Sequence, residues 1–324
     1  MRMLAGKPAE IAGQRLDLQM QWLCKLAALG RPDSPPVSEV PQVRADMEAF
    51  APALSGGGGR EVAREDRHID GQRGSIPIRI YRPGASDLPV LLLVYYHGGG
   101  WVIGSIESHD GLCAQLAADA RCTVVSVDYR MAPEHPFPAA VEDATDAFRW
   151  VREHAQELGG GPARVAVGGD SAGGNLAAVV SQQCAAFGEP GPSLQLLIYP
   201  ATDLSRESAS YATYGEGFYL TRARIEWFKD IYIPVEERAD VRASPLRSEK
   251  LSGQPPAHVI TAGFDPLCDE GRAYANALEA AGVAVTYKNY EGLIHGFASM
   301  AGLIPAARAA YDDMVETFRT LLHA

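Results

Sequence analysis

A serine flanked by glycines is the feature of this sequence whose residue types most directly suggest chemistry. Gly169-Asp170-Ser171-Ala172-Gly173 fits the pattern G-x-S-x-G, and it lies between the apolar segment RVAVGG and an alanine-rich segment of helical composition. Between a strand and a helix, this pattern forms a sharp turn that exposes the serine, and the glycines provide steric clearance. A glycine-rich turn with a helix-capping serine is the alternative. The context favours Ser171 as a nucleophile.

The base that such a serine needs is predicted from the order of residues along the chain. A serine hydroxyl is a weak nucleophile near neutral pH, so a base must be held against it. Where the G-x-S-x-G turn is used, the order is serine, then an acid, then histidine. Only His295 and His323 follow a plausible acid, and His323 stands at the C-terminal end. His295, in a glycine-containing loop, is therefore the predicted base, with a plain surface-loop histidine as the alternative.

Asp265 is the predicted partner of that base. It directly follows the apolar segment HVITAGF, so its side chain should reach the sheet edge where loops after parallel strands carry functional groups. There it would orient His295 and stabilise the imidazolium. Asp269 and Glu270 compete for this role, but we expect them in the first turn of the next helix, where carboxylates interact favourably with the helix dipole.

The segment YYHGGGW, residues 95–101, is expected to hold the negatively charged oxygen of a tetrahedral intermediate. Its three glycines follow an apolar run, and glycine lets backbone N–H groups approach a ligand closely. Ala172 would add its N–H from the start of a helix. A phosphate-binding turn is the alternative, but no lysine follows and G-x-G-x-x-G is absent. His97 is expected to brace this loop through hydrogen bonds rather than act as a base.

Strand-like and helical segments alternate along most of the chain. SIPIRIYRP alternates apolar and polar residues, and five apolar runs follow it: LPVLLLVYY, CTVVSVDYR, RVAVGGD, LQLLIYP and AHVITAGFD. Apolar runs separated by helices are typical of parallel strands that are covered on both faces. The pattern predicts an α/β protein with a largely parallel sheet.

Two helical regions lie outside this alternation. Apolar residues between 10 and 30 fall at helical spacing, and SGGGGR, residues 55–60, is expected as a flexible loop after that region. About fifty residues of helical composition precede AHVITAGFD, more than a crossover requires. We interpret this second region as an inserted cap over the sheet edge.

The composition is that of an ordinary globular protein of 324 residues, 47% hydrophobic and 21% charged. No run of about eighteen apolar residues is present, and the N-terminal apolar stretch is shorter than a secretory signal requires, so we expect a cytoplasmic protein without a membrane span. Five scattered cysteines lack the spacing of metal or redox sites. The net charge of −11 disfavours nucleic acid and anionic membranes as partners.

Five segments together resemble the hormone-sensitive-lipase-like branch of the α/β hydrolases, the bacterial family IV carboxylesterases. In family order they are HGGGW, DYRMAPEHPFPAAVEDA, GDSAGGN, DPLCDEG and HGF, and the resemblance covers the chain from about residue 75 to its end. It implies one α/β-hydrolase domain over residues 1–324, with a mostly parallel central sheet flanked by helices. The catalytic core would be about 60–203 and 236–324, and a helical cap would be about 1–50 plus an insertion at about 204–235.

The resemblance also implies an activity and a set of residues. It implies hydrolysis of short- to medium-chain carboxylic esters through an acyl-enzyme, with no cofactor and no metal. Ser171 would be the nucleophile, His295 the base and Asp265 its orienting acid. The oxyanion hole would be formed by Gly99, Gly100 and Ala172, and Arg130 and Glu134 would buttress the site. Candidates for the acyl pocket are Trp101, Phe218, Leu220, Trp227 and Phe228, although taken singly each is expected in the core more often than in contact with substrate.

Two other functions stay open at this point. An amidase or peptidase of the same fold would use the same residues, and no feature of the sequence excludes it. A ligand-binding receptor is known among relatives in which the catalytic histidine is replaced, and the presence of His295 disfavours it. The expected partner is a small-molecule ester, and both a monomer and a homodimer are compatible with the sequence.

Overall fold

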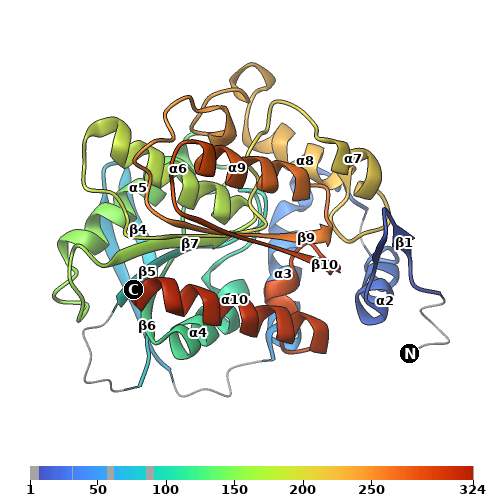
Figure 1. Ribbon diagram of the computed structural model, residues 1–324, viewed down its shortest axis with the longest axis horizontal. Coiled ribbons are helices and arrows are strands. Elements are labelled where there is room, and N and C mark those ends of the chain that lie inside the picture. Colours follow the sequence, from blue (N-terminus) through green and yellow to red (C-terminus); the bar gives the residue numbers. More distant parts are fainter. Residues whose placement is uncertain (1–6, 31, 57–61, 85–90, 324) are drawn as a thin grey trace.

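The computed structural model describes residues 7–30, 32–56, 62–84 and 91–323. Its centre is an eight-stranded sheet in the order β10-β9-β8-β7-β5-β6-β4-β3 (Figure 1). The strands are β3 Ala63–Gly71, β4 Gly74–Arg82, β5 Leu91–Tyr96, β6 Cys122–Val127, β7 Val165–Asp170, β8 Gln195–Ile198, β9 Ala257–Phe264 and β10 Val285–Ile294. Neighbours from β6 to β10 are parallel, whereas β4 is antiparallel to β6 and β3 to β4. The predicted mostly parallel sheet is confirmed.

Helices cover both faces of this sheet (Figure 1). On one face lie α5 (Ala139–Glu153), α6 (Ala172–Phe187) and α9 (Cys268–Ala280), and on the other lie α4 (Ile106–Ala120) and α10 (Pro305–His323). Along β5, Leu92 and Val94 belong to the first core, whereas Leu91 and Leu93 belong to the second. Because both faces of β5 are buried, its sequence is an uninterrupted apolar run.

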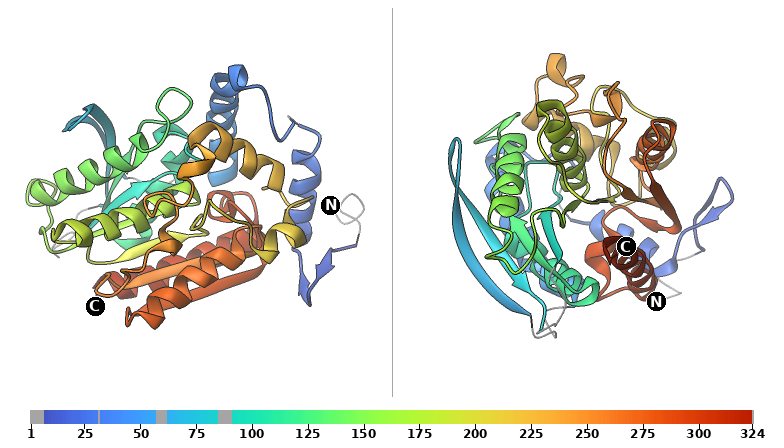
Figure 2. Two further views of the ribbon diagram at one scale, coloured as in Figure 1. Left: turned by 90° about the horizontal axis from the view of Figure 1, so that it is seen from above. Right: turned by 60° about the vertical axis from the view of Figure 1, so that its left-hand side comes forward.

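The chain between β8 and β9 forms the predicted helical insertion. Its elements are α7 (Ala209–Tyr214), α8 (Arg222–Tyr232) and the 3-10 helices η2 (Val235–Glu237) and η3 (Pro245–Arg247). The N-terminal region reaches α8, since the indole Nε1 of Trp227 donates to the Pro35 carbonyl at 2.7 Å, and the two segments run close together in Figure 2. The two regions assigned to a cap are therefore in contact.

The N-terminal helix starts later than the apolar spacing of residues 10–30 predicts. A hairpin of β1 (Glu10–Ile11) and β2 (Gln14–Arg15) comes first, and α2 spans Leu18–Ala27. Ala12 and Gly13 have φ angles of 53° and 81°, which form the hairpin turn and exclude a helix there. Asp17 then begins α2 by accepting the N–H groups of its first turn. The 3-10 helix η1 (Val37–Glu39) and α3 (Val40–Ser55) follow.

β3 is a strand that hydrophobic patterning does not predict. Its sequence, AREDRHIDG, is mostly charged, and it pairs with β4 at the outer edge of the sheet. Residues 57–60 of the predicted glycine-rich loop lie outside the described residues. Across the described ranges, no helix is both long and apolar enough to cross a membrane.

Candidate active site

Ser171 occupies the corner between β7 and α6. Its backbone φ and ψ are 56° and −117°, a conformation that residues with a Cβ rarely adopt. A Cβ on Gly173 would overlap the carbonyl oxygen of Tyr96, and one on Gly169 would overlap the backbone of Gly173. The Ser171 N–H donates to the Ile198 carbonyl at 2.8 Å, which ties the turn to β8. The predicted strand–turn–helix corner is present, and the glycines give it clearance.

The structure brings Ser171, His295 and Asp265 together in one hydrogen-bonded chain. His295, directly after β10, places Nε2 2.9 Å from Ser171 Oγ and Nδ1 2.7 Å from Asp265 Oδ2. Asp265 follows β9, is fully buried, and also accepts the Leu267 N–H at 2.9 Å. The Tyr199 ring, with its centroid 4.6 Å from that of His295, packs against the imidazole. This arrangement can pass a proton from the serine to the histidine.

The two competing carboxylates point elsewhere. Asp269 Oδ2 accepts the Ser210 N–H at 2.9 Å, at the start of α7. Glu270 Oε1 accepts the Thr202 N–H at 2.6 Å, beyond the end of β8. Burial raises the pKa of Glu270 to about 8, although hydrogen bonds from the backbone oppose the shift. Both residues lie in the first turn of α9, as expected, but they fasten it to the insertion, a role the sequence did not predict.

The loop between β5 and α4 follows the strand that pairs with β7, and it carries two glycines whose N–H groups could act as donors. Gly99 and Gly100 have φ angles of 119° and 61°, and the Gly99 carbonyl accepts the N–H groups of Val102 and Ile103 at 3.1 and 2.9 Å. In the part of the chain that the structure describes, no hydrogen bond uses the N–H groups of Gly99, Gly100 or Ala172. These donors are available to a ligand oxygen.

A buried carboxylate holds the start of this loop. Asp170, next to the nucleophile, accepts the Gly98 N–H at 3.0 Å and the Tyr95 hydroxyl at 2.8 Å. The buried His109 of α4 places Nε2 3.4 Å from the same carboxylate. Burial opposes ionisation of Asp170, but its interactions with His109 and the hydrogen bond from the Tyr95 hydroxyl outweigh burial and hold the pKa of Asp170 below its usual value. Asp170 therefore connects the nucleophile turn, the glycine loop and α4.

His97 braces the loop, as expected from the sequence. Its ring stacks on Tyr129 with a centroid distance of 4.3 Å, and the Tyr129 hydroxyl donates to the His97 carbonyl at 2.7 Å. The imidazole is completely buried, which lowers the pKa of His97 to about 3. A neutral, buried ring that contacts the loop from behind is a structural support and not a base.

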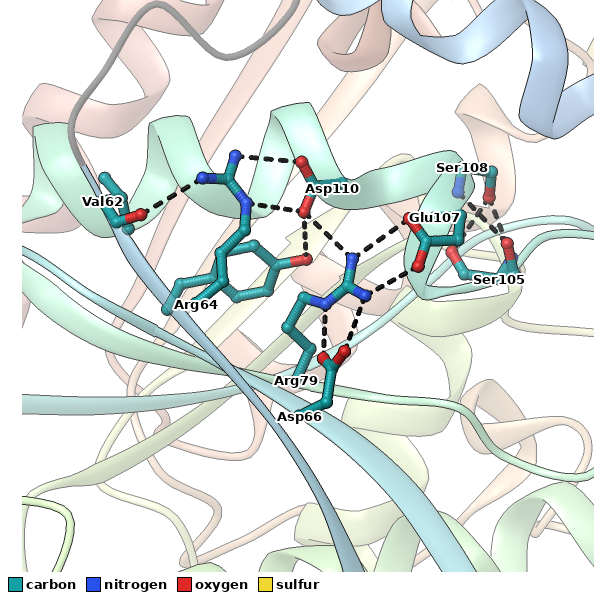
Figure 3. A network of polar contacts seen from close by, with 9 residues as sticks. Val62, Arg64, Asp66, Arg79, Ser105, Glu107, Ser108 and Asp110 are labelled. Carbon is teal, nitrogen blue, oxygen red and sulfur yellow. Dashed lines mark hydrogen bonds and ion pairs between the residues drawn. The ribbon is translucent and has the colours of Figure 1, made fainter.

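The first turn of α4 is itself fixed by charged residues on the neighbouring strands (Figure 3). Arg79 of β4 bonds Glu107 at 2.7 Å and Asp66 of β3 at 2.6 Å, and Arg64 bonds Asp110 at 2.9 Å. Ser105 and Ser108 form a capping box at the start of this helix. Because α4 follows the glycine loop directly, these contacts fix where that loop ends.

A second support comes from the N-terminal region. Arg44 of α3 donates to the Val102 carbonyl in the loop and to the Ala132 carbonyl, each at 2.8 Å, and it pairs with both oxygens of Glu134. Arg130 pairs with Asp143 of α5 at 2.7 Å. Arg130 and Glu134 therefore hold the segment between β6 and α5 in place. The sequence did not indicate that Arg44 would be the partner of Glu134.

The five pocket candidates have different surroundings. The Phe228 ring lies directly over Gly100, where a Cβ would overlap it. Trp101 is buried and stacks on Tyr232 at 4.5 Å, and Phe218 packs on Phe264 at 5.1 Å. Leu220 and Trp227 are buried in the main core. Phe228 is therefore the candidate whose side chain borders the glycine loop from the cap side.

Comparison with known proteins identifies the family. A family model described as alpha/beta hydrolase fold matches residues 93–299. The chain is 44% identical over 327 residues to the carboxylic ester hydrolase LipN of Mycobacterium tuberculosis (strain ATCC 25618 / H37Rv), which covers 98% of this chain and 86% of that protein. The chain belongs to the hormone-sensitive-lipase-like α/β hydrolases.

Other hydrolases of this kind agree with that assignment. The chain is 41% identical over 286 residues to the ethyl acetate hydrolase of Pseudomonas putida, which covers 87% of this chain and 90% of that protein. The structure of ester-hydrolase EH1AB1 from the metagenome of Lake Arreo, complexed with a derivative of bipyridine phosphonate, matches with a TM-score of 0.89 and 44% identity. That match covers 95% of this chain and 100% of that one. The fold and family predicted from the motifs are confirmed.

Proposed function

We propose that Ser171, His295 and Asp265 are the catalytic triad of this carboxylic ester hydrolase, and that it cleaves small esters with short to medium acyl chains. The observation that carries the proposal is the continuous chain from Asp265 through His295 to Ser171, with distances of 2.7 and 2.9 Å. This series of hydrogen bonds leads to Ser171, which lies in a strained turn. The N–H group of the following residue, Ala172, is not used by any hydrogen bond within the described residues.

In the first half of the reaction, Ser171 Oγ attacks the ester carbonyl while His295 Nε2 takes the hydroxyl proton. The carbonyl oxygen becomes negative and accepts hydrogen bonds from the N–H groups of Gly99, Gly100 and Ala172. When the tetrahedral intermediate collapses, the bond to the alcohol breaks and His295 gives its proton to the leaving oxygen. Asp265 keeps the imidazole in position and stabilises its positive charge throughout.

The second half repeats these steps with water. His295 removes a proton from a water molecule, which attacks the acyl-enzyme, and the same donors hold the oxyanion. Collapse releases the carboxylic acid and returns the proton to Ser171. No residue beyond this set is required, and no three His, Cys, Asp or Glu side chains in the described ranges are grouped so that they could hold a metal ion.

The test compares wild type with Ser171→Ala on 4-nitrophenyl esters from acetate to laurate. We expect kcat/KM to peak at short or medium chains and to fall by about 10⁴-fold or more in the variant. Ser252→Ala, at an exposed position, is the matched control and should keep the wild-type profile. Absence of serine-dependent turnover across the series would overturn the proposal. Hydrolysis of matched anilides would then test the amidase alternative, and ligand binding without turnover would test the receptor alternative.

A further inference from the structure

Arg224 of α8 is a cationic side chain that forms no direct ion pair with a carboxylate among the residues the structure describes. It is half-buried, and its guanidinium lies over the rings of Trp227 and Phe228, with Cζ 5.2 and 5.9 Å from the two centroids. Nη2 donates to the Pro32 carbonyl at 3.1 Å, but Nη1 is buried without a hydrogen-bond acceptor among the described residues. Burial lowers the pKa of Arg224, against the weaker opposing influence of Asp33 and Tyr219.

Other cap arginines show what ordinary pairing looks like in this protein. Arg222, two residues away on the same helix, bonds Glu207 at 2.6 Å, and Arg238 bonds Asp230 at 2.6 Å. Arg224 forms no ion pair of this kind with any carboxylate in the described ranges. A guanidinium that is partly removed from water and has an unused N–H group is suited to bind an anion.

The position of Arg224 relates it to both sides of the catalytic centre. Phe228, which its guanidinium contacts, lies directly over Gly100 of the oxyanion loop. Tyr219, whose phenol interacts electrostatically with the guanidinium, has a ring atom 3.4 Å from where a Cβ of Gly296 would be, next to His295. The charge is thus flanked by one aromatic ring that borders the oxyanion side and another that borders the histidine side.

We propose that Arg224 binds a carboxylate carried by the substrate, so that the preferred substrates are short esters with a free carboxylate group remote from the scissile bond. The proposal rests on the proposed esterase function and narrows its substrate class. The aromatic rings of Phe228 and Trp227 offer apolar surface to the carbon chain between the two groups. Because the chain has a net charge of −11, its overall field repels anions, and a local cation is needed to select them.

The test uses two pairs of substrates that differ in one charge. Monoethyl adipate against diethyl adipate places the carboxylate on the acyl side, and 4-acetoxybenzoate against its methyl ester places it on the alcohol side. In wild type, we expect kcat/KM to be about tenfold or more higher for the acid in one of these pairs, after correction for the two ester groups of diethyl adipate. In Arg224→Gln that ratio should fall at least tenfold, mainly through KM, and Arg224→Lys should retain part of it.

Arg222→Gln is the control, because it removes an exposed, paired guanidinium from the same helix and should leave the ratio as in wild type. If wild type shows nearly equal kcat/KM for the acid and the neutral ester in both substrate pairs, the proposal is overturned without the need for a variant. Equal losses on acid and neutral ester in Arg224→Gln would also overturn it, since they would show that Arg224 only fastens the 32–35 segment to α8. Serine-dependent hydrolysis of the neutral esters separates either result from a failure of the proposed function.

Discussion

On one side of Ser171, the imidazole of His295 and the carboxylate of Asp265 are hydrogen-bonded in series, and their proposed roles use these side-chain atoms. On the other side, the proposed role of the loop that contains Gly99 and Gly100 uses backbone N–H groups, and the side chains near this loop support it. A substitution on the first side removes a reacting group. A substitution on the second side would displace a backbone N–H donor without removing it. The two sides should therefore respond to mutation in different ways.

The supports of the glycine loop are distributed over distant parts of the chain. Asp170 holds its start, Arg44 holds its middle, and Arg79 fixes the helix that follows it. On the histidine side, the described contacts of His295 and Asp265 come from the loops after β9 and β10 and from the ring of Tyr199. Loss of function should therefore be abrupt on the histidine side and graded on the glycine side.

The largest expected effect is that of Asp265→Asn. Without the carboxylate, nothing holds the imidazole tautomer that accepts the serine proton, and the loss of kcat/KM should be about 10⁴-fold. Steady-state kinetics with a short 4-nitrophenyl ester measures it, and circular dichroism confirms folding. Asp269→Asn changes a nearby carboxylate in the first turn of α9 that bonds Ser210 instead of His295, so the loss of kcat/KM should stay within about tenfold. Equal losses in the two variants would contradict the assignment of Asp265.

A second prediction concerns Gly100→Ala, which changes no reacting side chain. The new Cβ would overlap the Phe228 ring, displace the loop and lower kcat by about 10²- to 10³-fold. Adding Phe228→Ala removes the obstacle and should restore a large part of the loss in a double-mutant cycle. Gly99→Ala, whose Cβ would overlap the backbone of Ile103, should gain nothing from Phe228→Ala. Rescue of both glycine variants, or of neither, would show that Phe228 does not set the position of Gly100.

The smallest effect on activity is expected for Glu270→Gln, which tests the support on the histidine side. The pKa of about 8, above the ordinary 4.5, means that the folded protein keeps a proton which the unfolded chain loses. Stability from this group is therefore fully present below pH 4.5 and lost as the pH rises to about 8. Gln cannot titrate, so the stability of Glu270→Gln relative to wild type should improve by about 4 kcal/mol between pH 5 and 8.5.

Thermal unfolding of Glu270→Gln and wild type across that pH range measures this difference. Glu279→Gln, at an exposed position of the same helix, is the control. Its stability difference from wild type should change less with pH than that of Glu270→Gln. Activity at neutral pH should fall less than tenfold, because Glu270 contacts the insertion rather than His295. A stability difference that moves against Gln as the pH rises would show that Glu270 is ionised in the folded protein.

Short-range patterns explain what the sequence could predict. The turn at Ser171 is encoded within five residues, and Asp265 and His295 were found because each follows a strand in a fixed order. Contacts between residues far apart leave no such pattern. Nothing in the sequence indicated that Arg44 would meet Glu134 or that Phe228 would cover Gly100, since both contacts depend on where α3 and α8 lie relative to the sheet.

β3 was missed for a different reason, because its charged residues hide it from a search based on apolar alternation. Those charges have a consequence for the molecule among its own copies. An outermost strand exposes unpaired backbone groups to which another chain's strand could add, and charged side chains along such a strand oppose that addition. On β3 and its neighbour, Arg79 pairs with Asp66 and Arg67 pairs with Glu65 (Figure 3 shows the first pair). A strand added along β3 would meet these charged side chains, which oppose edge-to-edge pairing at this side of the sheet.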